Sequence, residues 1–202
     1  MKTATDTGAS TRGRPRYDLS TLLDVAAEAF TERGYDGTSM EDLSRATGLS
    51  KSSLYHHVDG KEHLLRLALE RAVDPLYAVL HEAERHSGSA VERLEYVLRR
   101  EVEVLADRLP YVTLLLRVRG NTETERWALD RRRGFDKAVT ALVEAGIAEG
   151  GLRADLDAAT VTRLVFGMIN SAIEWYRPGR GSMTADELAD HVVSVTFGGL
   201  RA

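Results

Sequence analysis

The chain has 202 residues, of which 43% are hydrophobic and 29% charged, a balance typical of a globular protein with its own core. It contains no cysteine, which excludes disulfides, thiolate metal sites and cysteine nucleophiles. The formal net charge of −4 gives no sign of nucleic-acid binding, so any such role must rest on local clusters of basic residues.

The N-terminal segment, residues 1–16, is rich in Thr, Gly and Ser and ends in RGRPR, which predicts a disordered basic arm. Arg14 and Arg16 of this arm, with Arg12, are placed to reach DNA phosphates or a minor groove; the alternative is a solvated tail. The segment lacks the apolar run of a signal peptide, and no apolar run elsewhere is long enough to span a bilayer. We therefore expect a cytoplasmic protein without membrane contact.

The spacing of apolar residues predicts an all-α protein of about nine helices, because no stretch shows the alternation typical of strands. The expected helices, in chain order, cover residues 19–33, 39–47, 51–57, 61–80, 91–105, 110–116, 123–149, 158–176 and 184–197. Three of these helices begin with the spacing of a capping box: Thr38 with Glu41, Thr122 with Glu125, and Thr184 with Glu187. Pro75 is expected to interrupt or kink the fourth helix.

The character of the helices changes near residues 73–80, from short and linked by turns to long and more apolar. This change divides the chain into the basic arm at 1–16, a small helical module at 17–63 and a helical bundle at 64–202. Two short helices joined by a tight turn at Gly48, and packed on a third, have the arrangement of a helix-turn-helix.

The second of these short helices, SKSSLYHH, is polar except for Leu54. A helix that enters a major groove needs a narrow, polar outer face, which this segment supplies. We predict that Ser52 and Ser53 face the bases and that Tyr55 reaches a phosphate; the alternative is an ordinary solvated surface. The full set of predicted DNA contacts is Arg14, Arg16, Thr38, Ser39, Lys51, Ser52, Ser53, Tyr55, His56, His57 and Lys61.

Residues 30–65, FTERGYDGTSMEDLSRATGLSKSSLYHHVDGKEHLL, resemble the DNA-binding segment of the TetR family of transcriptional regulators. The resemblance implies a homodimer that binds an inverted-repeat operator in double-stranded DNA, with a small-molecule pocket in the C-terminal bundle. Two positions depart from the family pattern: Val58 stands where an aromatic residue is usual, and Gly60 where a serine is usual.

The last two predicted helices carry apolar residues on more than one side, which predicts burial against both the core and a second subunit. They look like the paired-helix dimer interface of the family, around residues 158–176 and 184–198. The segment GMINSAIEWYRPGRG, residues 167–181, resembles a subgroup that responds to acyl-CoA thioesters, including repressors of fatty-acid, phenylacetate and steroid-ring degradation. In this segment Trp175 and Tyr176 are expected to pack.

An acyl-CoA has an apolar tail and several phosphates, which suits the mixture of arginines and apolar residues in the segment 111–135. The alternative is a solvated helix face whose arginines pair with neighbouring carboxylates. The candidate ligand residues, most of which could equally be plain core, are Leu105, Leu109, Tyr111, Leu115, Arg119, Trp127, Phe166 and Asn170.

The leading hypothesis is a DNA-binding repressor released by a small molecule. An enzyme is a poor match, because the chain has no zinc-protease pair, no Gly-rich phosphate loop and no paired nucleophile and base. A helical scaffold protein remains the alternative, although it leaves the polar short helix unexplained. No cofactor is expected, and no metal, because His56 and His57 point about 100° apart on a helix and cannot readily share an ion.

Overall fold

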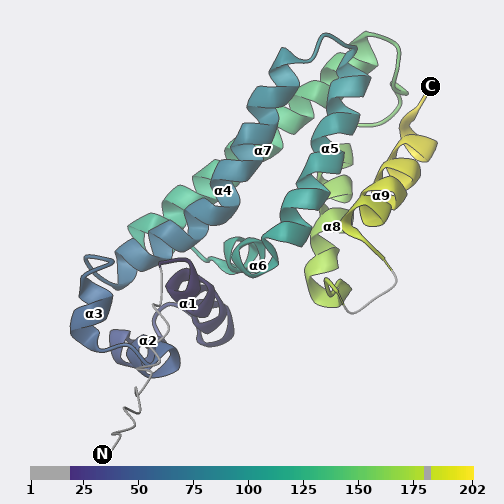
Figure 1. The fold of residues 1–202 in the computed structure, drawn as a ribbon. Helices are drawn as coiled ribbons and strands as arrows, with labels where there is room; N and C mark the ends of the chain where they lie inside the picture. Colours follow the sequence, from purple (N-terminus) through teal and green to yellow (C-terminus); the bar gives the residue numbers. More distant parts are fainter. Residues whose placement is uncertain (1–18, 180–182) are drawn as a thin grey trace, which may run out of the picture.

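The computed structural model describes residues 19–179 and 183–202, and these ranges are built from helices without a named strand (Figure 1). The helices are α1 Leu19–Arg33, α2 Met40–Thr47, α3 Lys51–Tyr55, α4 Lys61–Arg85, α5 Ala90–Asp107, α6 Leu109–Arg117, α7 Glu123–Ala148, α8 Ala158–Trp175 and α9 Ala185–Leu200. The predicted all-α class is confirmed, and the predicted helices all occur.

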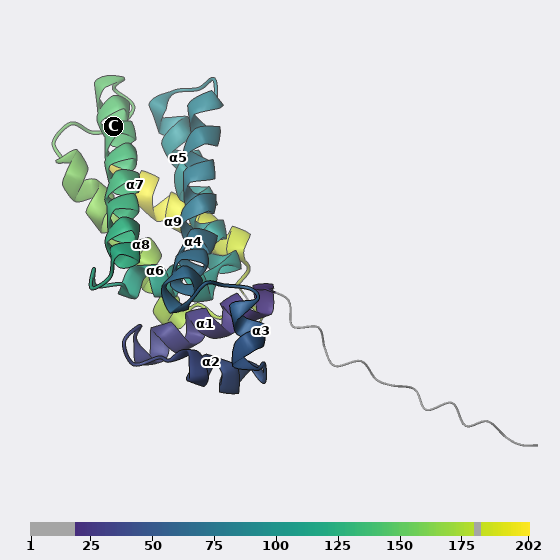
Figure 2. The same ribbon diagram turned by 90° about the vertical axis from the view of Figure 1, so that its left-hand side faces the viewer.

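The molecule is elongated, and α1, α2 and α3 form a small head at one end (Figures 1 and 2). From the head, α4 continues into the bundle, where it packs against α5, α6 and α7. α8 packs on α7, and α9 packs on α5. The predicted boundary between residues 63 and 64 falls inside α4, so the head and the bundle share one continuous helix.

The core of the head is made by a few large apolar side chains. α1 contributes Leu22, Leu23 and Phe30, α2 contributes Leu43, and α3 contributes Leu54, all at most 3% exposed. α3 has only five residues, and an isolated helix of that length is not stable in water. The burial of Leu54 therefore does most to hold α3 in place, since a fully buried leucine contributes roughly 1.5–3 kcal/mol.

Ser39, rather than Thr38, caps α2. The Ser39 hydroxyl accepts from the Asp42 amide at 3.1 Å, and the Asp42 carboxylate accepts from the Ser39 amide at 2.9 Å, which completes a capping box. The Thr38 hydroxyl instead donates to two carbonyls at the end of α1, at 3.2 and 2.9 Å, and its side chain is fully buried. The sequence offered two adjacent hydroxyl residues, each with an acid three positions later, and the prediction took the wrong one.

The other two predicted capping boxes differ in outcome. Thr184 and Glu187 form the complete box at the start of α9. At α7, the Thr122 hydroxyl accepts from the Glu125 amide at 3.1 Å, but the Glu125 carboxylate accepts from the amide of Asn121 at 2.6 Å. The box at α7 is therefore only half formed, because the Glu125 carboxylate accepts from the amide of Asn121 and not from that of the N-cap residue Thr122.

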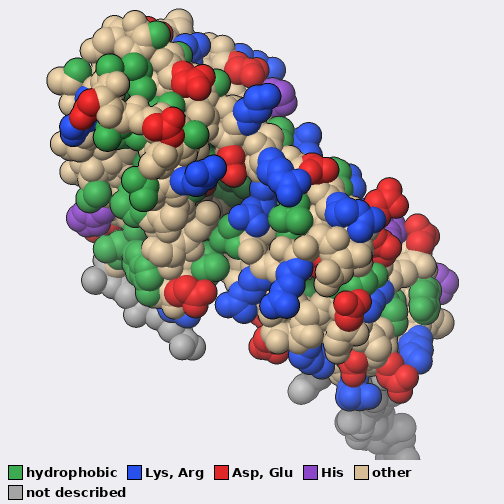
Figure 3. Space-filling model, turned by 180° about the vertical axis from the view of Figure 1, so that it is seen from behind, with side chains coloured by type: hydrophobic (Ala, Val, Ile, Leu, Met, Phe, Trp, Pro, Cys, Tyr) green, Lys and Arg blue, Asp and Glu red, His purple; other side chains and the backbone are tan. Residues whose placement is uncertain are grey.

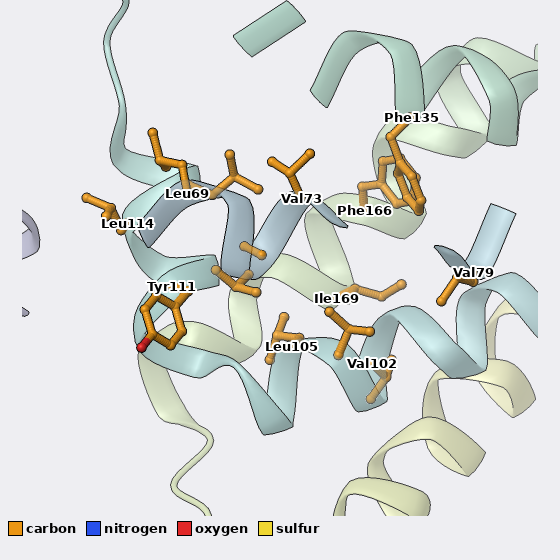
Figure 4. Close-up of a cluster of buried hydrophobic side chains, with 14 of the residues drawn as sticks. Leu69, Val73, Val79, Val102, Leu105, Tyr111, Leu114, Phe135, Phe166 and Ile169 are labelled. Carbon is orange, nitrogen blue, oxygen red and sulfur yellow. The ribbon is translucent and has the colours of Figure 1, made fainter. Parts of the chain in front are cut away.

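Pro75 does not interrupt α4, which runs unbroken from Lys61 to Arg85. The proline removes one backbone hydrogen bond, but α4 buries apolar side chains both before and after it, and this packing keeps the helix continuous. Figure 4 shows Leu69, Val73 and Val79 from the two sides of the proline gathered with Ile169 of α8 in one cluster.

Candidate DNA-binding surface and ligand cavity

The outer surface of the head is polar because α3 turns its few apolar side chains inward. The predicted turn is present: Gly48 has a φ of 68°, which favours glycine, and the Ser50 hydroxyl caps α3 by accepting from the Ser53 amide at 3.1 Å. Tyr55 is 53% exposed although it is aromatic. The side chains of α3 and its C-terminal turn that face solvent are those of Lys51, Ser52, Tyr55, His56 and His57, while Ser53 is half-buried.

Both lysines of the predicted surface have partners within the protein. The Lys51 ammonium lies 3.0 Å from a Glu41 carboxylate oxygen, and because both side chains are largely exposed this pair is weak and easily exchanged for a phosphate. The Lys61 ammonium donates to the Tyr35 carbonyl at 2.8 Å and lies 4.0 Å from the centre of the Tyr35 ring. Lys61 therefore also ties the start of α4 to the end of α1.

Two of the predicted DNA contacts are changed by their surroundings. Thr38 is fully buried, so we assign it to the shape of the head rather than to a phosphate contact. Ser39 is exposed, but its hydroxyl serves the cap of α2. The same hydroxyl and amide lower the pKa of the Asp42 carboxyl. Arg14 and Arg16 lie outside the described residues, as does Arg12.

A cavity of about 380 Å³ lies inside the bundle, between α4, α5, α6, α7 and α8. Its apolar wall includes Phe135 and Phe166, whose rings stack with centres 5.8 Å apart (Figure 4). It also includes Tyr77, whose ring centre lies 6.4 Å from that of Phe135. Its polar wall holds the basic side chains of Arg131, Arg132, Arg133, Lys137 and Arg163. Lys and Arg side chains gather around a hollow in the middle of the face shown in Figure 3.

Four of the eight predicted ligand residues line this cavity: Leu105, Leu115, Phe166 and Asn170. The other four do not line it. Leu109 packs against the core at the start of α6, and Arg119 lines a separate cleft beside the head. Tyr111 is buried between α6 and α1, where its hydroxyl donates to Asp24. The Trp127 ring stacks under the guanidinium of Arg66, 3.4 Å from the ring centre.

The prediction missed the cavity's two acids. Glu101 of α5 is 7% exposed, and burial, with the nearby negative charge of Asp136, raises its pKa to about 8. Burial also raises the pKa of Asp136, although Arg132 and Arg163 oppose that shift. The signal for Glu101 was present in the sequence, because this acid falls on the apolar stripe of α5 between Leu98 and Leu105.

α8 and α9 present an apolar surface to solvent. An apolar groove of about 250 Å³ runs between α5, α8 and α9, and among the described residues that line it only Ser171, His191 and the indole of Trp175 carry a polar group. Trp175 and Val195, which line this groove, are 54% and 65% exposed, and Leu164 of α8 is 69% exposed. Tyr176 packs as expected, at 6% exposed, but the neighbouring Trp175 does not, since it extends into solvent.

Within residues 19–179 and 183–202, no helix is long and apolar enough to cross a membrane. In the same part of the chain, no group of three His, Asp or Glu side chains is arranged to hold a metal ion.

A helix-turn-helix head, joined by one long helix to a bundle with an internal cavity, defines the class of ligand-responsive, DNA-binding transcriptional regulators. Two family models match the chain: bacterial regulatory proteins of the tetR family over residues 22–68, and the tetracyclin repressor-like C-terminal domain over residues 87–200. The chain belongs to the TetR family of transcriptional regulators. It is therefore a DNA-binding regulator, of a family whose curated relatives are repressors, and not an enzyme.

Among its relatives, the transcriptional repressor KstR2 of Rhodococcus jostii is 30% identical over 184 residues, 90% of each chain. The crystal structure of a TetR-family regulator from Streptomyces coelicolor A3 is 62% identical, with a TM-score of 0.82, and the match covers 90% of this chain and 92% of that one. The structure of AibR with isovaleryl coenzyme A and operator DNA is 25% identical, with a TM-score of 0.74, covering 90% of this chain and 98% of that one.

Proposed function

We propose that the protein is a transcriptional repressor that binds an inverted-repeat operator as a homodimer and leaves it when a CoA thioester enters the bundle cavity. Residues 17–63 carry DNA reading, and residues 64–202 carry ligand binding and dimerisation. A repressor acts where chromosomal DNA is, so we place it in the cytoplasm. The observation that carries the proposal is the burial of Leu54 beneath an α3 whose Lys51, Ser52 and Tyr55 face solvent.

DNA contacts divide between bases and phosphates. Ser52 and Ser53 have short hydroxyl side chains that let the α3 backbone approach base edges, so we assign them to sequence reading. Tyr55, Lys51 and His57 extend further and suit the phosphates on either side of the groove, together with His56 and Lys61. Arg14 and Arg16 of the N-terminal arm are proposed to follow the backbone or enter the minor groove.

The DNA test begins by selecting operators from a random duplex library with the wild-type protein. Ser53→Ala is expected to change the selected sequence, because a base contact discriminates between sequences. Tyr55→Phe and Lys51→Ala are expected to weaken binding to all duplexes about equally, and Lys51→Ala to reduce the slope of log affinity against log salt by about one unit. Fluorescence anisotropy over a salt series measures these quantities.

Tyr96→Phe is the matched control for Tyr55→Phe, because Tyr96 donates to Glu82 at 2.6 Å between α4 and α5, in the bundle. It should leave operator affinity unchanged. Failure of the wild-type protein to select any palindromic sequence would refute the operator proposal. Equal weakening of all duplexes by Ser53→Ala would move that residue from the bases to the backbone.

The dimer is supported by the exposed apolar surface of α8 and α9, because monomeric proteins rarely expose contiguous apolar patches of this kind. Val195→Asp places a charge within this surface and is expected to give monomers in light scattering. Leu156→Asp is the matched control, since Leu156 is also exposed but lies in the loop before α8. If Val195→Asp stays dimeric, the interface lies elsewhere.

The ligand class is supported by the shape and charge of the cavity. A volume of about 380 Å³ holds roughly a dozen water-sized groups, enough for an acyl group but not for a whole coenzyme A. The apolar wall suits the acyl group, and the basic residues suit phosphates that remain outside. The structural similarity to AibR, which was crystallised with isovaleryl coenzyme A, supports the same assignment.

The ligand test uses isothermal titration with isovaleryl-CoA, octanoyl-CoA, free CoA and octanoate. We expect the thioesters to bind more tightly than either fragment. Lys137→Ala with Arg163→Ala is expected to weaken thioester binding about tenfold or more, because two charges are lost at the cavity. Arg126→Ala is the control, because it also removes a guanidinium from α7 but one that does not line the cavity. The Arg126 guanidinium instead donates a hydrogen bond to the Gly120 carbonyl before α7. Tighter binding of octanoate than of octanoyl-CoA would contradict the assignment.

A further inference from the structure

Glu101 is an acid without a partner in the wall of the cavity. It lies on α5 between residues that form the apolar core, and it is 7% exposed. Its Oε2 atom is buried and accepts or donates no hydrogen bond among the described residues. A buried polar atom without a partner costs free energy, and native proteins leave few of them.

The state of this carboxyl group follows from its surroundings. Burial and the negative charge of Asp136 hold the pKa of Glu101 at about 8, so its carboxyl is mostly neutral at pH 7. A neutral carboxyl carries one O–H donor, and a donor needs an acceptor. Neither threonine of the cavity supplies that acceptor: Thr140 bonds to Thr162 at 3.1 Å and Thr162 to the Ala158 carbonyl at 2.9 Å, and the buried Glu101 Oε2 has no partner.

We propose that Glu101 selects the acyl group of the ligand by donating a hydrogen bond to a carbonyl or hydroxyl oxygen carried on that acyl group. The cavity then prefers an acyl thioester with its own neutral oxygen over the plain hydrocarbon of the same size. This inference rests on the thioester class proposed above and adds the substituent that the cavity recognises.

Two other roles for Glu101 fit the structure less well. An ionised Glu101 paired with a cationic ligand is disfavoured, because Arg132, Lys137 and Arg163 line the same cavity and repel a second positive charge. A purely structural role is disfavoured because Oε2 has no partner in the protein. Arg131 Nε, another buried atom of the described lining without a partner, belongs to a guanidinium that stacks 3.5 Å from the centre of the Tyr77 ring.

The test compares acyl groups that differ only by one oxygen. The probes are cyclohexylacetyl-CoA, (3-oxocyclohexyl)acetyl-CoA and (4-oxocyclohexyl)acetyl-CoA, titrated by calorimetry at pH 7. A second series carries the same acyl groups on N-acetylcysteamine, which keeps the thioester but has no phosphates. The second series therefore tests the acyl contact even if the protein does not take coenzyme A.

The wild-type protein is expected to bind one oxo probe about threefold to tenfold more tightly than the hydrocarbon probe, as one added hydrogen bond allows. Glu101→Leu should still bind the hydrocarbon probe and lose the preference, whereas Glu101→Gln, which keeps a donor, should retain it. Glu103→Gln on the same helix, whose carboxylate pairs with Arg100, is the control and should leave the preference intact.

Three outcomes would overturn this proposal. The first is that neither series shows an oxygen preference, whether because both probes bind equally or because none binds. The second is an unchanged preference in Glu101→Leu, and the third is equal weakening of oxo and hydrocarbon probes by Glu101→Leu. The last outcome would place the thioester carbonyl against Glu101. An oxygen preference that depends on Glu101 in the N-acetylcysteamine series, without binding of the CoA series, would reject the CoA thioester and keep the contact.

Discussion

The head and the bundle keep their functional residues in opposite places. In the head, the proposed DNA-contacting side chains are mainly those left outside when Leu54 is buried, so function is marked by exposure. In the bundle, the cavity is lined by side chains such as Leu105 and Phe166, which are as buried as ordinary core residues. Burial therefore separates function from structure in the head but not in the bundle.

The sharpest test of this difference replaces one buried and one exposed leucine. Leu54→Ala is expected to lower the free energy of unfolding by about 2–5 kcal/mol, because it leaves a cavity under α3. Leu164→Ala, at a position that is 69% exposed, should change it by less than about 0.5 kcal/mol under conditions where the protein is monomeric. Urea unfolding measures both.

Operator binding extends the same comparison. Leu54→Ala should abolish operator binding while thioester binding in the bundle persists, because the cavity is remote from α3. A loss below about 1 kcal/mol for Leu54→Ala would show that α3 is held by contacts other than this anchor, and the comparison between the two regions would fail.

The turn, cap and anchor of α3 could be predicted from the sequence because each depends on residues that are close together in the chain. Gly48 marks the turn, Ser50 the cap and Leu54 the anchor, and each acts within a few residues of its own position. Where two local signals competed, as at Thr38 and Ser39, the structure was needed, because only the packing against α1 decides which hydroxyl turns inward.

The cavity could be predicted only in part because its walls come from five helices that are distant in the sequence. Leu105 and Leu115 line the cavity, while Tyr111, one turn from Leu115 on α6, turns towards α1. Apolar periodicity cannot distinguish these two residues, since residues four apart lie on one face of a helix and both side chains are buried. Glu101 was the exception, since an acid within an apolar stripe is visible without the fold.

A second test concerns this acid and the pH dependence of stability. Glu101 releases its proton near pH 4.5 when unfolded and near 8 when folded, where Asp136 of α7 faces it. The folded state holds the extra proton between these values, so the free energy of unfolding should fall as pH rises through this range. Glu101→Gln has no proton to release at this position. Its free energy of unfolding should therefore rise relative to that of the wild type by up to about 1.4 kcal/mol for each unit of increasing pH.

Urea unfolding of both proteins at pH 6, 7 and 8, at one protein concentration, measures the difference and cancels the titration of other groups. A constant difference across this range would mean that Glu101 is ionised in the folded protein. Its carboxyl would then be negatively charged, like that of Glu41 in the head, and could not donate a hydrogen bond to a ligand.

A third test concerns the contact between the two regions. α6 lines the cavity through Val112 and Leu115 and reaches α1 through the hydrogen bond from Tyr111 to Asp24. Tyr111→Phe is expected to lower the free energy of unfolding by about 0.5–1.5 kcal/mol. It should also reduce the loss of operator affinity caused by saturating thioester, because a ligand acts only through contacts that differ between the two states.

Operator affinity with and without saturating isovaleryl-CoA measures this coupling. Tyr96→Phe again serves as the control, because it removes a tyrosine hydrogen bond within the bundle and should leave the coupling unchanged. If both variants reduce the coupling equally, α6 has no special part in joining the cavity to the head.

The smallest expected effect lies at the start of α4, where head and bundle meet. Gly60 precedes this helix without a side-chain cap, whereas Ser39 and Ser50 cap α2 and α3. Its backbone is extended, with φ 167° and ψ −174°, and an added Cβ would meet no atom within 4 Å. Gly60→Ser is therefore expected to supply a side-chain cap and to raise the urea midpoint. The free energy of unfolding should increase by a few tenths up to about 1 kcal/mol.

Gly60→Ala is the matched control, because alanine adds the same Cβ without a hydroxyl and is a poorer cap than glycine. It should give no gain, and an equal gain from both variants would assign the effect to the unfolded chain rather than to the cap. If Gly60→Ser stabilises the protein and leaves the selected operator unchanged, the start of α4 affects stability without affecting the surface that reads DNA. A changed operator would instead show that this junction sets the position of α3.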